Sequence, residues 1–254
     1  NNQENTEKSN TNQPYINSIS SKNSAPQCLS SNHKEESQTG RSIKDSSFQY
    51  ITSNMINNEE LKPEEKWLVL HCIHTTADQD FENLLNVHPS TINKWHEYLQ
   101  NKGTIITDVT MVQSGIRKIL LEKYNISCHC YLNEDQAFKL SKENDITRSR
   151  AAMRLAIENN PNALFAIGNA PTALFELTEQ IENNTINPAG IIAAPVGFIN
   201  VIESKNRIRE ACENSSTNIP YLIIEGRKGG SNIASTLLNA IITLDEYTAV
   251  KYYR

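Results

Sequence analysis

Residues 163–175 read ALFAIGNAPTALF, and this stretch decides the fold. The apolar run ALFAI ends at Gly168, which is typical of a buried strand in a parallel sheet. The following NAP sequence favours a tight turn, and Pro171 suits the first position of a helix. Apolar side chains then recur at helical spacing over residues 172–181. The stretch therefore predicts a strand, a tight turn and a helix.

The start of this predicted helix is a candidate ligand site. A helix N-terminus presents free backbone N–H groups and a partial positive charge to an anion. The same order of strand, turn and helix recurs along the chain, so we expect a ligand to lie across several such turns. The alternative is a helix that packs closely on the sheet with no ligand at the turn.

The recurrence of this pattern predicts an α/β fold. Helices are expected at residues 62–71, 80–87, 89–102, 111–124, 133–143, 148–160, 172–181, 202–212 and 232–244. Five strands are expected at residues 104–109, 126–132, 163–167, 190–196 and 220–224. Because parallel crossovers need a helix, this order indicates a flavodoxin-like three-layer sandwich with a five-stranded parallel sheet. Ligands of such sheets bind outside the carboxyl ends of the strands, where four turns fall: residues 108–111, 168–172, 195–198 and 226–231.

Composition excludes several classes of function. The 254 residues carry a net charge of -5, which argues against non-specific nucleic-acid binding. No apolar run approaches the roughly 18 residues of a membrane span, and no secretory signal is visible. Five cysteines without framework spacing suit a reducing compartment. These features predict a cytoplasmic protein.

The polar N-terminus predicts a boundary between two parts of the chain. Residues 1–40 have too few apolar side chains to offset the entropy of ordering, so they are expected to form a disordered tail. Order should begin near Ile43, with a short helix around Ser47 that docks on the rest. Residues 41–254 are then expected to form one α/β domain.

Two histidines three residues apart stand out within HCIHTTAD. His71 and His74 can share a helix face. They could be a satisfied pair at a helix end, or metal ligands with Asp78 as the third, or one of them could be a general acid–base group at a cleft. Cys128 and Cys130 alternate along a strand, which favours buried free cysteines over a metal site. We therefore predict no metal site.

Two further stretches carry cations next to turns. Arg148 lies in the first turn of a predicted helix, where a cation opposes the helix dipole, so an anionic ligand could be its partner. The alternative is a surface pair with Glu143 or Asp145. The loop GRKGGS at residues 226–231 has two cations and a helix cap, but it lacks the spacing of an ATP-binding loop.

Taken together, the turns resemble those of the precorrin-8X and cobalt-precorrin-8 methylmutases. The match runs from about Ser47 to Ala240, in the same order and at similar spacing. Six motifs carry it: IHTTADQDF at 73–81, TDVTMVQSGI at 107–116, TRSRAAMR at 147–154, IGNAPTALFEL at 167–177, PVGFINVIESK at 195–205 and EGRKGGS at 225–231.

The resemblance implies a flavodoxin-like homodimer that uses no organic cofactor. It also implies a reaction late in corrin-ring construction for vitamin B12. In that reaction a methyl group migrates from C-11 to C-12 of the macrocycle, which gives hydrogenobyrinate or cobyrinate.

The resemblance also implies site residues. The family's catalytic histidine falls on His74, its substrate-contacting arginine on Arg148, and a substrate-contacting serine on Ser47. The position three before the catalytic histidine is often arginine, and here it is His71. Further substrate contacts are expected on the turns, where helix N-termini and cations could hold the carboxylate rim of a corrin: Met111, Asn169, Thr172, Arg227 and Gly229.

Two rival functions fit some of the same residues. A flavodoxin-like flavin or nucleotide module would place phosphate at the helix starts. A corrinoid carrier with little activity would follow from the loss of an arginine at His71. Yellow colour in the purified protein would favour the first, and absence of turnover would favour the second.

Overall fold

The structure is a computed structural model that describes residues 38–56 and 60–249. The expected disordered tail lies almost wholly outside the described residues. Helix α1 (Gln38–Asn54) starts five residues before Ile43 and is longer than the short helix expected there. It packs along helix α2 (Pro63–Thr76), which extends beyond its expected end at residue 71.

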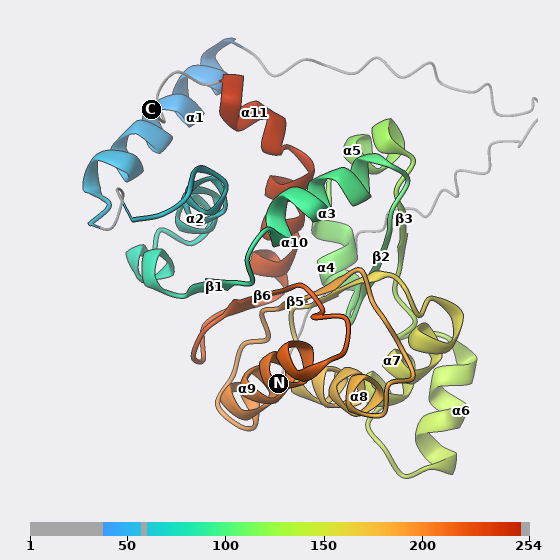
Figure 1. The fold of residues 1–254 in the computed structure, drawn as a ribbon. Coiled ribbons are helices and arrows are strands. Elements are labelled where there is room, and N and C mark those ends of the chain that lie inside the picture. Colours follow the sequence, from blue (N-terminus) through green and yellow to red (C-terminus); the bar gives the residue numbers. More distant parts are fainter. Residues whose placement is uncertain (1–37, 57–59, 250–254) are drawn as a thin grey trace, which may run out of the picture. The chain divides into compact units, whose positions relative to one another are not determined.

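One mixed sheet forms the centre of the described chain (Figure 1). The strands lie in the order β1-β6-β5-β4-β2-β3, and the five from β6 to β3 pair in parallel. A strand lies within each of the five stretches where one was expected. The strands are β1 (Leu85–Val87), β2 (Thr104–Thr107), β3 (Ser127–His129), β4 (Leu164–Ile167), β5 (Gly190–Ala193) and β6 (Tyr221–Ile224).

The expectation of a five-stranded, wholly parallel sheet is wrong at one edge. Residues 80–87 were expected to be a helix, but they form a short 3-10 helix, η1 (Gln79–Asn83), and then β1, which pairs antiparallel with β6. The Asn86 amide also donates to the Glu225 carboxylate (2.7 Å). The edge of β6 presents unpaired backbone groups, and pairing with them outweighs the local helical pattern.

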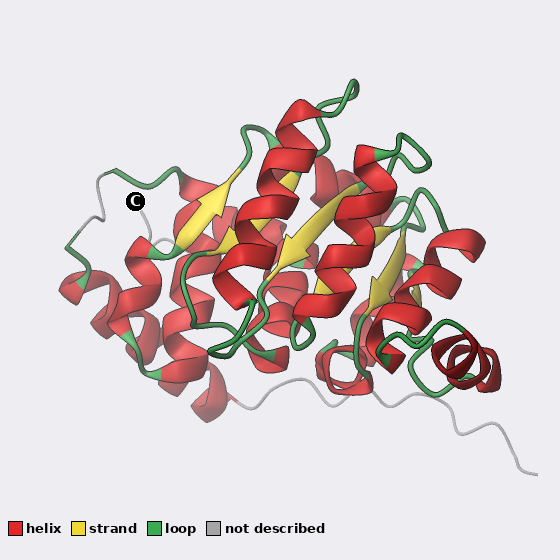
Figure 2. Cartoon of the chain, turned by 90° about the horizontal axis from the view of Figure 1, so that it is seen from below, coloured by secondary structure: helices red, strands yellow, loops and turns green. Residues whose placement is uncertain are grey.

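Helices cover both faces of the sheet (Figures 1 and 2). The remaining helices of the described chain are α3 (Thr91–Gln100), α4 (Thr110–Gly115), α5 (Lys118–Tyr124), α6 (Asp135–Glu143), α7 (Arg148–Asn159), α8 (Pro171–Glu182), α9 (Val201–Asn214), α10 (Ser231–Ile242) and α11 (Leu244–Ala249).

The single helix expected over residues 111–124 is also wrong, because it breaks into α4 and α5. Ile116 ends α4 in an extended conformation, which interrupts the helical hydrogen bonds. Asn239 of α10 bridges the break: its amide donates to the Gly115 carbonyl (2.9 Å), and its oxygen accepts from the Arg117 N–H (2.9 Å). A side chain distant in sequence therefore satisfies the backbone groups that the break exposes.

The core has two parts, one on each face of the sheet. In β4, Leu164 and Ala166 face a cluster formed with α1, α2, α3 and α10, whereas Phe165 and Ile167 face a cluster formed with α7, α8 and α9. All four side chains are fully buried. This burial on both faces explains why the strand sequence is a continuous apolar run.

Candidate active site

The turn after β4 is occupied by a carboxylate of the protein. Asp108, which follows β2, accepts hydrogen bonds from three successive backbone N–H groups, those of Gly168 (3.0 Å), Asn169 (2.8 Å) and Ala170 (2.7 Å). Burial raises the pKa of the Asp108 carboxyl, and the three N–H donors oppose that rise. The groups expected to face an anionic ligand therefore bind an internal anion.

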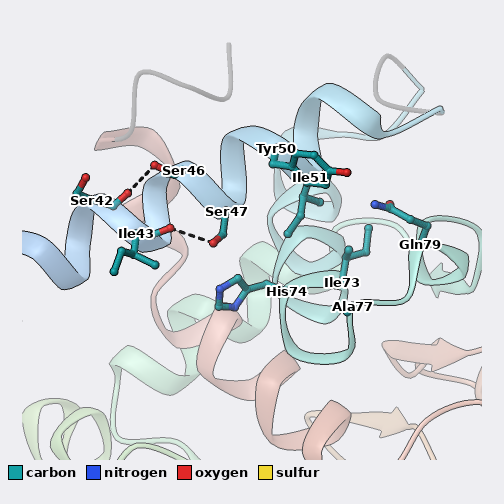
Figure 3. A pocket seen from close by; sticks show the side chains of 10 residues that line it. All are labelled: Ser42, Ile43, Ser46, Ser47, Tyr50, Ile51, Ile73, His74, Ala77 and Gln79. Carbon is teal, nitrogen blue, oxygen red and sulfur yellow. Dashed lines mark hydrogen bonds between the residues drawn. The ribbon is translucent and has the colours of Figure 1, made fainter.

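An open cavity of about 640 Å³ lies between α1 and the end of α2. This volume is within the range of small-molecule sites. Much of the wall is apolar, and two of its side chains are largely exposed: Ile43 (64%) and Tyr50 (68%). Ten residues line the cavity, and Figure 3 shows them: Ser42, Ile43, Ser46, Ser47, Tyr50, Ile51, Ile73, His74, Ala77 and Gln79.

Phe48 holds α1 against α2 beside this cavity. Its buried ring meets the rings of Trp67, His71 and His74 edge-on, at centroid distances of 6.1, 5.0 and 5.1 Å. The Trp67 indole N–H donates to the Ala240 carbonyl of α10 (2.8 Å), so α2 is fixed in turn. One wall of the cavity thus depends on the packing of an aromatic ring against the two histidines.

The hydroxyl groups of α1 donate to their own helix. Ser47 Oγ donates to the Ile43 carbonyl (2.9 Å), and Ser46 Oγ donates to the Ser42 carbonyl (2.8 Å; Figure 3). A ligand carboxylate is a stronger acceptor than a carbonyl because its charge assists the hydrogen bond. Rotation about one side-chain bond would let Ser47 donate to such a ligand.

His74 projects from the last turn of α2 toward the side of the cavity formed by Ile43 and Ser47 (Figure 3). Partial burial lowers the pKa of its imidazole from the ordinary 6.5, and the positive charge of Lys44 lowers it further. The side chain remains exposed to the cavity. His74 therefore combines access to a ligand with an imidazole whose pKa is lowered by burial and by Lys44.

His71 lies one turn earlier on α2, in a more buried position. Burial lowers the pKa of His71 to about 3, and repulsion from Lys44, His74 and Arg117 acts in the same direction. Its Nε2 is buried and has no hydrogen-bond partner among the described residues. A ring that stays neutral cannot supply the positive charge of the arginine that the resemblance leads one to expect here.

Arg148 begins α7 and is exposed. Its guanidinium lies 5.1 Å from the centroid of the Phe138 ring. Among the described residues it makes no ion pair, and Glu143 pairs with Lys139 instead (3.8 Å). The alternative of a surface pair with Glu143 or Asp145 is therefore not formed, and the charge of Arg148 is available to a ligand.

The start of α7 is fixed to the start of α8. Thr147 Oγ1 caps α7 by accepting from the Arg150 N–H (3.2 Å) and donates to Thr172 Oγ1 (3.0 Å). Deeper in the same interface, the fully buried Glu176 carboxylate accepts from Arg150 (2.8 Å) and Arg154 (2.9 Å). These contacts place Thr172 beside the turn that carries Arg148.

Met111 and Asn169 lie near a junction of three segments. A Cβ atom at Gly168 would be 2.7 Å from Val112 Cγ2 and 2.9 Å from Ser231 Cα, so α4, the turn after β4 and the start of α10 meet there. Met111 is 69% exposed and Asn169 is exposed. Both side chains are therefore accessible, although neither lines the cavity at His74.

Gly229 makes a close backbone approach in the loop between β6 and α10. A Cβ atom there would lie 2.3 Å from the Ala194 carbonyl oxygen, which also accepts from the Gly230 N–H (2.8 Å). Gly229 therefore fixes the loop to the end of β5. Arg227 of the same loop is exposed and makes no ion pair within the described chain.

The structure thus brings only some of the predicted residues together. Ser47 and His74 share one cavity, and His71 packs beside it. Arg148 and Thr172 lie at the adjoining starts of α7 and α8. The remaining predicted residues lie on α4, on the turn after β4 or on the loop before α10: Met111, Asn169, Arg227 and Gly229.

Sequence reasoning did not identify the roles of Tyr50 and Asp108. Tyr50 was absent from the prediction because nothing in the sequence shows which side of α1 faces a cavity. Asp108 was passed over, although an acidic residue directly after a buried strand at the carboxyl edge was a usable signal. The described residues contain no cluster of three or more potential metal ligands, and none of their helices could span a membrane.

Comparisons with known proteins show the family of this chain. Residues 42–244 match the family model for precorrin-8X methylmutase. The cobalt-precorrin-8 methylmutase of Leptospira interrogans is 35% identical over 81% of this chain and 94% of its own length. That of Salmonella typhimurium is 36% identical over 71% of this chain and 81% of its own.

A solved structure gives the same result. The precorrin-8X methylmutase of Thermus thermophilus superposes with a TM-score of 0.73 at 28% identity, and the match covers 84% of this chain and 99% of that one. The family model and the two relatives match most of the chain, and the superposition shows the same fold. The chain therefore belongs to the precorrin-8X methylmutase family, as an isomerase of cobalamin biosynthesis.

Proposed function

We propose that His74 is the proton donor and acceptor for migration of a methyl group from C-11 to C-12 of a corrin macrocycle. The observation that carries this proposal is the position of His74 in the wall of the cavity between α1 and α2, facing Ser47. A methyl shift within a conjugated ring needs little covalent chemistry from a protein. It needs a shaped pocket and a positioned acid–base group.

The chemistry of the cavity suits a corrin. Ile43, Tyr50 and Ile73 offer an apolar surface to the flat ring, while Ser47 and His74 offer polar groups at its edge. Arg148 and Arg227 are exposed cations that can hold the acetate and propionate groups of the rim. Relatives named for cobalt-precorrin-8 and for precorrin-8X both match, so each compound is a candidate substrate.

The wider organisation is also part of the proposal. The five parallel strands follow the order second, first, third, fourth, fifth, which supports a flavodoxin-like fold. The loop after β5 exposes Val196, Phe198 and Ile199, which supports a homodimer through an apolar surface. Sedimentation of the purified protein tests the dimer, and fractionation of cells tests a cytoplasmic location.

The experiment that tests the proposal is single turnover of His74→Asn. Removal of a general acid–base group lowers a rate by roughly 10²–10⁴-fold. The absorption spectrum of cobalt-precorrin-8 mixed with stoichiometric enzyme reports the reaction, because methyl migration changes the conjugation. Corrinoid affinity should change far less, since the carboxylate rim is held elsewhere.

The matched control is His129→Asn, because His129 is exposed on β3 and does not line the cavity. It should react at the wild-type rate. His71→Asn should alter binding and stability more than the chemical step, because the buried His71 ring packs against Phe48 and Trp67. Near-native turnover by His74→Asn would show that another group moves the proton. An inactive wild-type protein that binds corrinoid would be a carrier.

A further inference from the structure

A buried lysine that makes no ion pair within the described chain lies outside the cavity. Lys205, in the second turn of α9, is 1% exposed. Its Nζ donates to the carbonyl oxygens of Gly226 (2.8 Å) and Lys228 (2.9 Å). Burial lowers the pKa of Lys205 to about 8. Burying a cation among carbonyls is costly, and an apolar side chain of similar length would avoid that cost, so packing alone does not explain a lysine here.

The segment that Lys205 holds is the loop between β6 and α10. Gly226, Gly229 and Gly230 all have positive φ angles (70°, 146° and 123°), so the chain itself does little to restrict the loop. The Arg227 carbonyl accepts from the Gly197 N–H (3.2 Å). The loop is therefore held in part by hydrogen bonds from neighbouring segments.

The loop in turn holds the segment that follows His74. Lys228 Nζ lies 2.5 Å from a carboxylate oxygen of Asp78 and 2.5 Å from one of Asp80. Asp78 also caps η1 by accepting from the Asp80 N–H (3.0 Å). Ala77, the residue between the end of α2 and these aspartates, is in the left-handed conformation (φ 55°). Lys228 therefore anchors the chain two and four residues after Thr76, the last residue of α2.

A second contact fixes the same end of α2. Thr75 Oγ1 lies 3.1 Å from Thr236 Oγ1 of α10, the helix that the loop introduces. His74 directly precedes Thr75. The last turn of α2 is therefore tied to the loop by Lys228 and to the following helix by Thr75, and both depend on where the loop lies.

We propose that Lys205 and Lys228 are positioning residues that set the place of His74 in the cavity. Lys205 fixes the loop through two carbonyl groups, and Lys228 transmits that position to Asp78 and Asp80. Neither lysine lines the cavity. Lys228, whose charge is neutralised by two aspartates, serves His74 rather than the carboxylate rim of the substrate. This inference rests on the proposed role of His74.

The test is a double-mutant cycle between Lys228→Met and His74→Asn. Displacement of a catalytic group by a fraction of an ångström to 1 Å lowers a rate by about 10- to 100-fold. Lys228→Met alone should therefore lose about 10-fold or more in single-turnover rate on cobalt-precorrin-8. In the His74→Asn background the same change should cost less than about 2-fold, because the group it positions is already absent.

Lys205→Met should behave in the same way. Lys94→Met is the matched control, because Lys94 is exposed on α3. It should leave the single-turnover rate unchanged in both the wild-type and the His74→Asn background. Thermal unfolding establishes that each variant is folded. If Lys205→Met does not fold, Lys228→Met still decides the matter, because Lys228 is 42% exposed and its removal leaves no buried charge.

The possible failures are distinct. If Lys228→Met lowered the single-turnover rate equally in the wild-type and His74→Asn backgrounds and also weakened corrinoid binding, Lys228 would contact the substrate. That result would overturn the inference. Unchanged turnover by Lys228→Met would overturn it as well. Near-native turnover by His74→Asn alone would instead refute the proposed role of His74.

Discussion

The turn after β4 and His74 at the end of α2 were both expected to meet a ligand, and the structure shows that they differ in what already occupies them. At the turn, three backbone N–H groups point to the Asp108 carboxylate at 2.7–3.0 Å. At the cavity, His74 faces a space of about 640 Å³ bordered by exposed apolar side chains. At the turn, the backbone N–H groups are already paired by the protein. At the cavity, the His74 imidazole is accessible to a ligand.

This difference shows that a helix start indicates where an anion is stable. It does not indicate whether that anion belongs to a ligand or to the protein. The potential that favours a phosphate or a carboxylate of a substrate favours an aspartate of the protein equally. The flavin or nucleotide function considered from the sequence would place phosphate at the helix starts. The Asp108 carboxylate already occupies one of these places, the turn after β4.

The largest expected effect comes from removing the internal anion. Asp108→Ala would leave three buried or partly buried N–H groups without an acceptor, at a cost of about 1 kcal/mol or more each. We expect the free energy of unfolding to fall by about 3 kcal/mol or more, measured by urea denaturation.

Asp135→Ala is the control for this change, because Asp135 is exposed in the first turn of α6 and should contribute less than about 1 kcal/mol through the helix dipole. If Asp108→Ala kept wild-type stability and bound inorganic phosphate tightly, the turn would be a ligand site after all. The contrast with the cavity would then disappear.

A smaller effect is expected from Arg148, whose charge the described protein leaves without an ion pair. Arg148→Ala should weaken corrinoid binding by about 1.5–3 kcal/mol if the guanidinium makes one charged hydrogen bond to the rim. Titration of the bound corrinoid spectrum measures this. Arg207→Ala is the control, because Arg207 already pairs with Glu182 on the surface (3.2 Å). Equal affinities of the two variants would remove Arg148 from the site.

The smallest expected effect concerns the pH dependence of His74. Burial and the positive charge of Lys44 both lower the pKa of His74 from 6.5, so the protonated donor should be lost, and the rate should fall, as pH rises through a value below 6.5. Lys44→Met removes the repulsion that disfavours the imidazolium. The midpoint of the single-turnover pH profile should therefore move upward, toward 6.5.

Lys139→Met is the control for that shift, because Lys139 lies on α6 and pairs with Glu143. The two profiles should differ only in the position of the midpoint. A downward movement in Lys44→Met, or an identical movement in Lys139→Met, would contradict the electrostatic account. Loss of the pH dependence in His74→Asn would assign the midpoint to this residue.

The parts that sequence predicted well are those decided by burial and local chemistry. The continuous apolar runs around residues 164–167, 190–193 and 221–224 could only be satisfied between two layers of helices, and the structure buries them on both faces. Threonine directly before a helical pattern is a local cap signal, and the Thr147 hydroxyl accepts from the third residue of α7.

The parts that sequence missed depend on partners distant along the chain. β1 exists because β6 offers an unpaired edge 139 residues away in sequence, as the contact between Asn86 and Glu225 records. The Asn239 side chain pairs with the backbone groups exposed at the break between α4 and α5. The charge of Lys228 is neutralised by aspartates 148 and 150 residues away. No local pattern encodes such pairings, since each is chosen by the fold as a whole.

The sequence by itself therefore determined the layers of the fold and the carboxyl edge as the place of its turns. The resemblance of its motifs to a known family singled out His74 as the acid–base candidate. Tertiary structure alone decided which of those turns is filled, which side of α1 forms a cavity, and why His71 stays neutral. The physical reason is that periodicity and residue type report burial and charge. Whether a charge already has a partner depends on which distant side chain the fold brings to it.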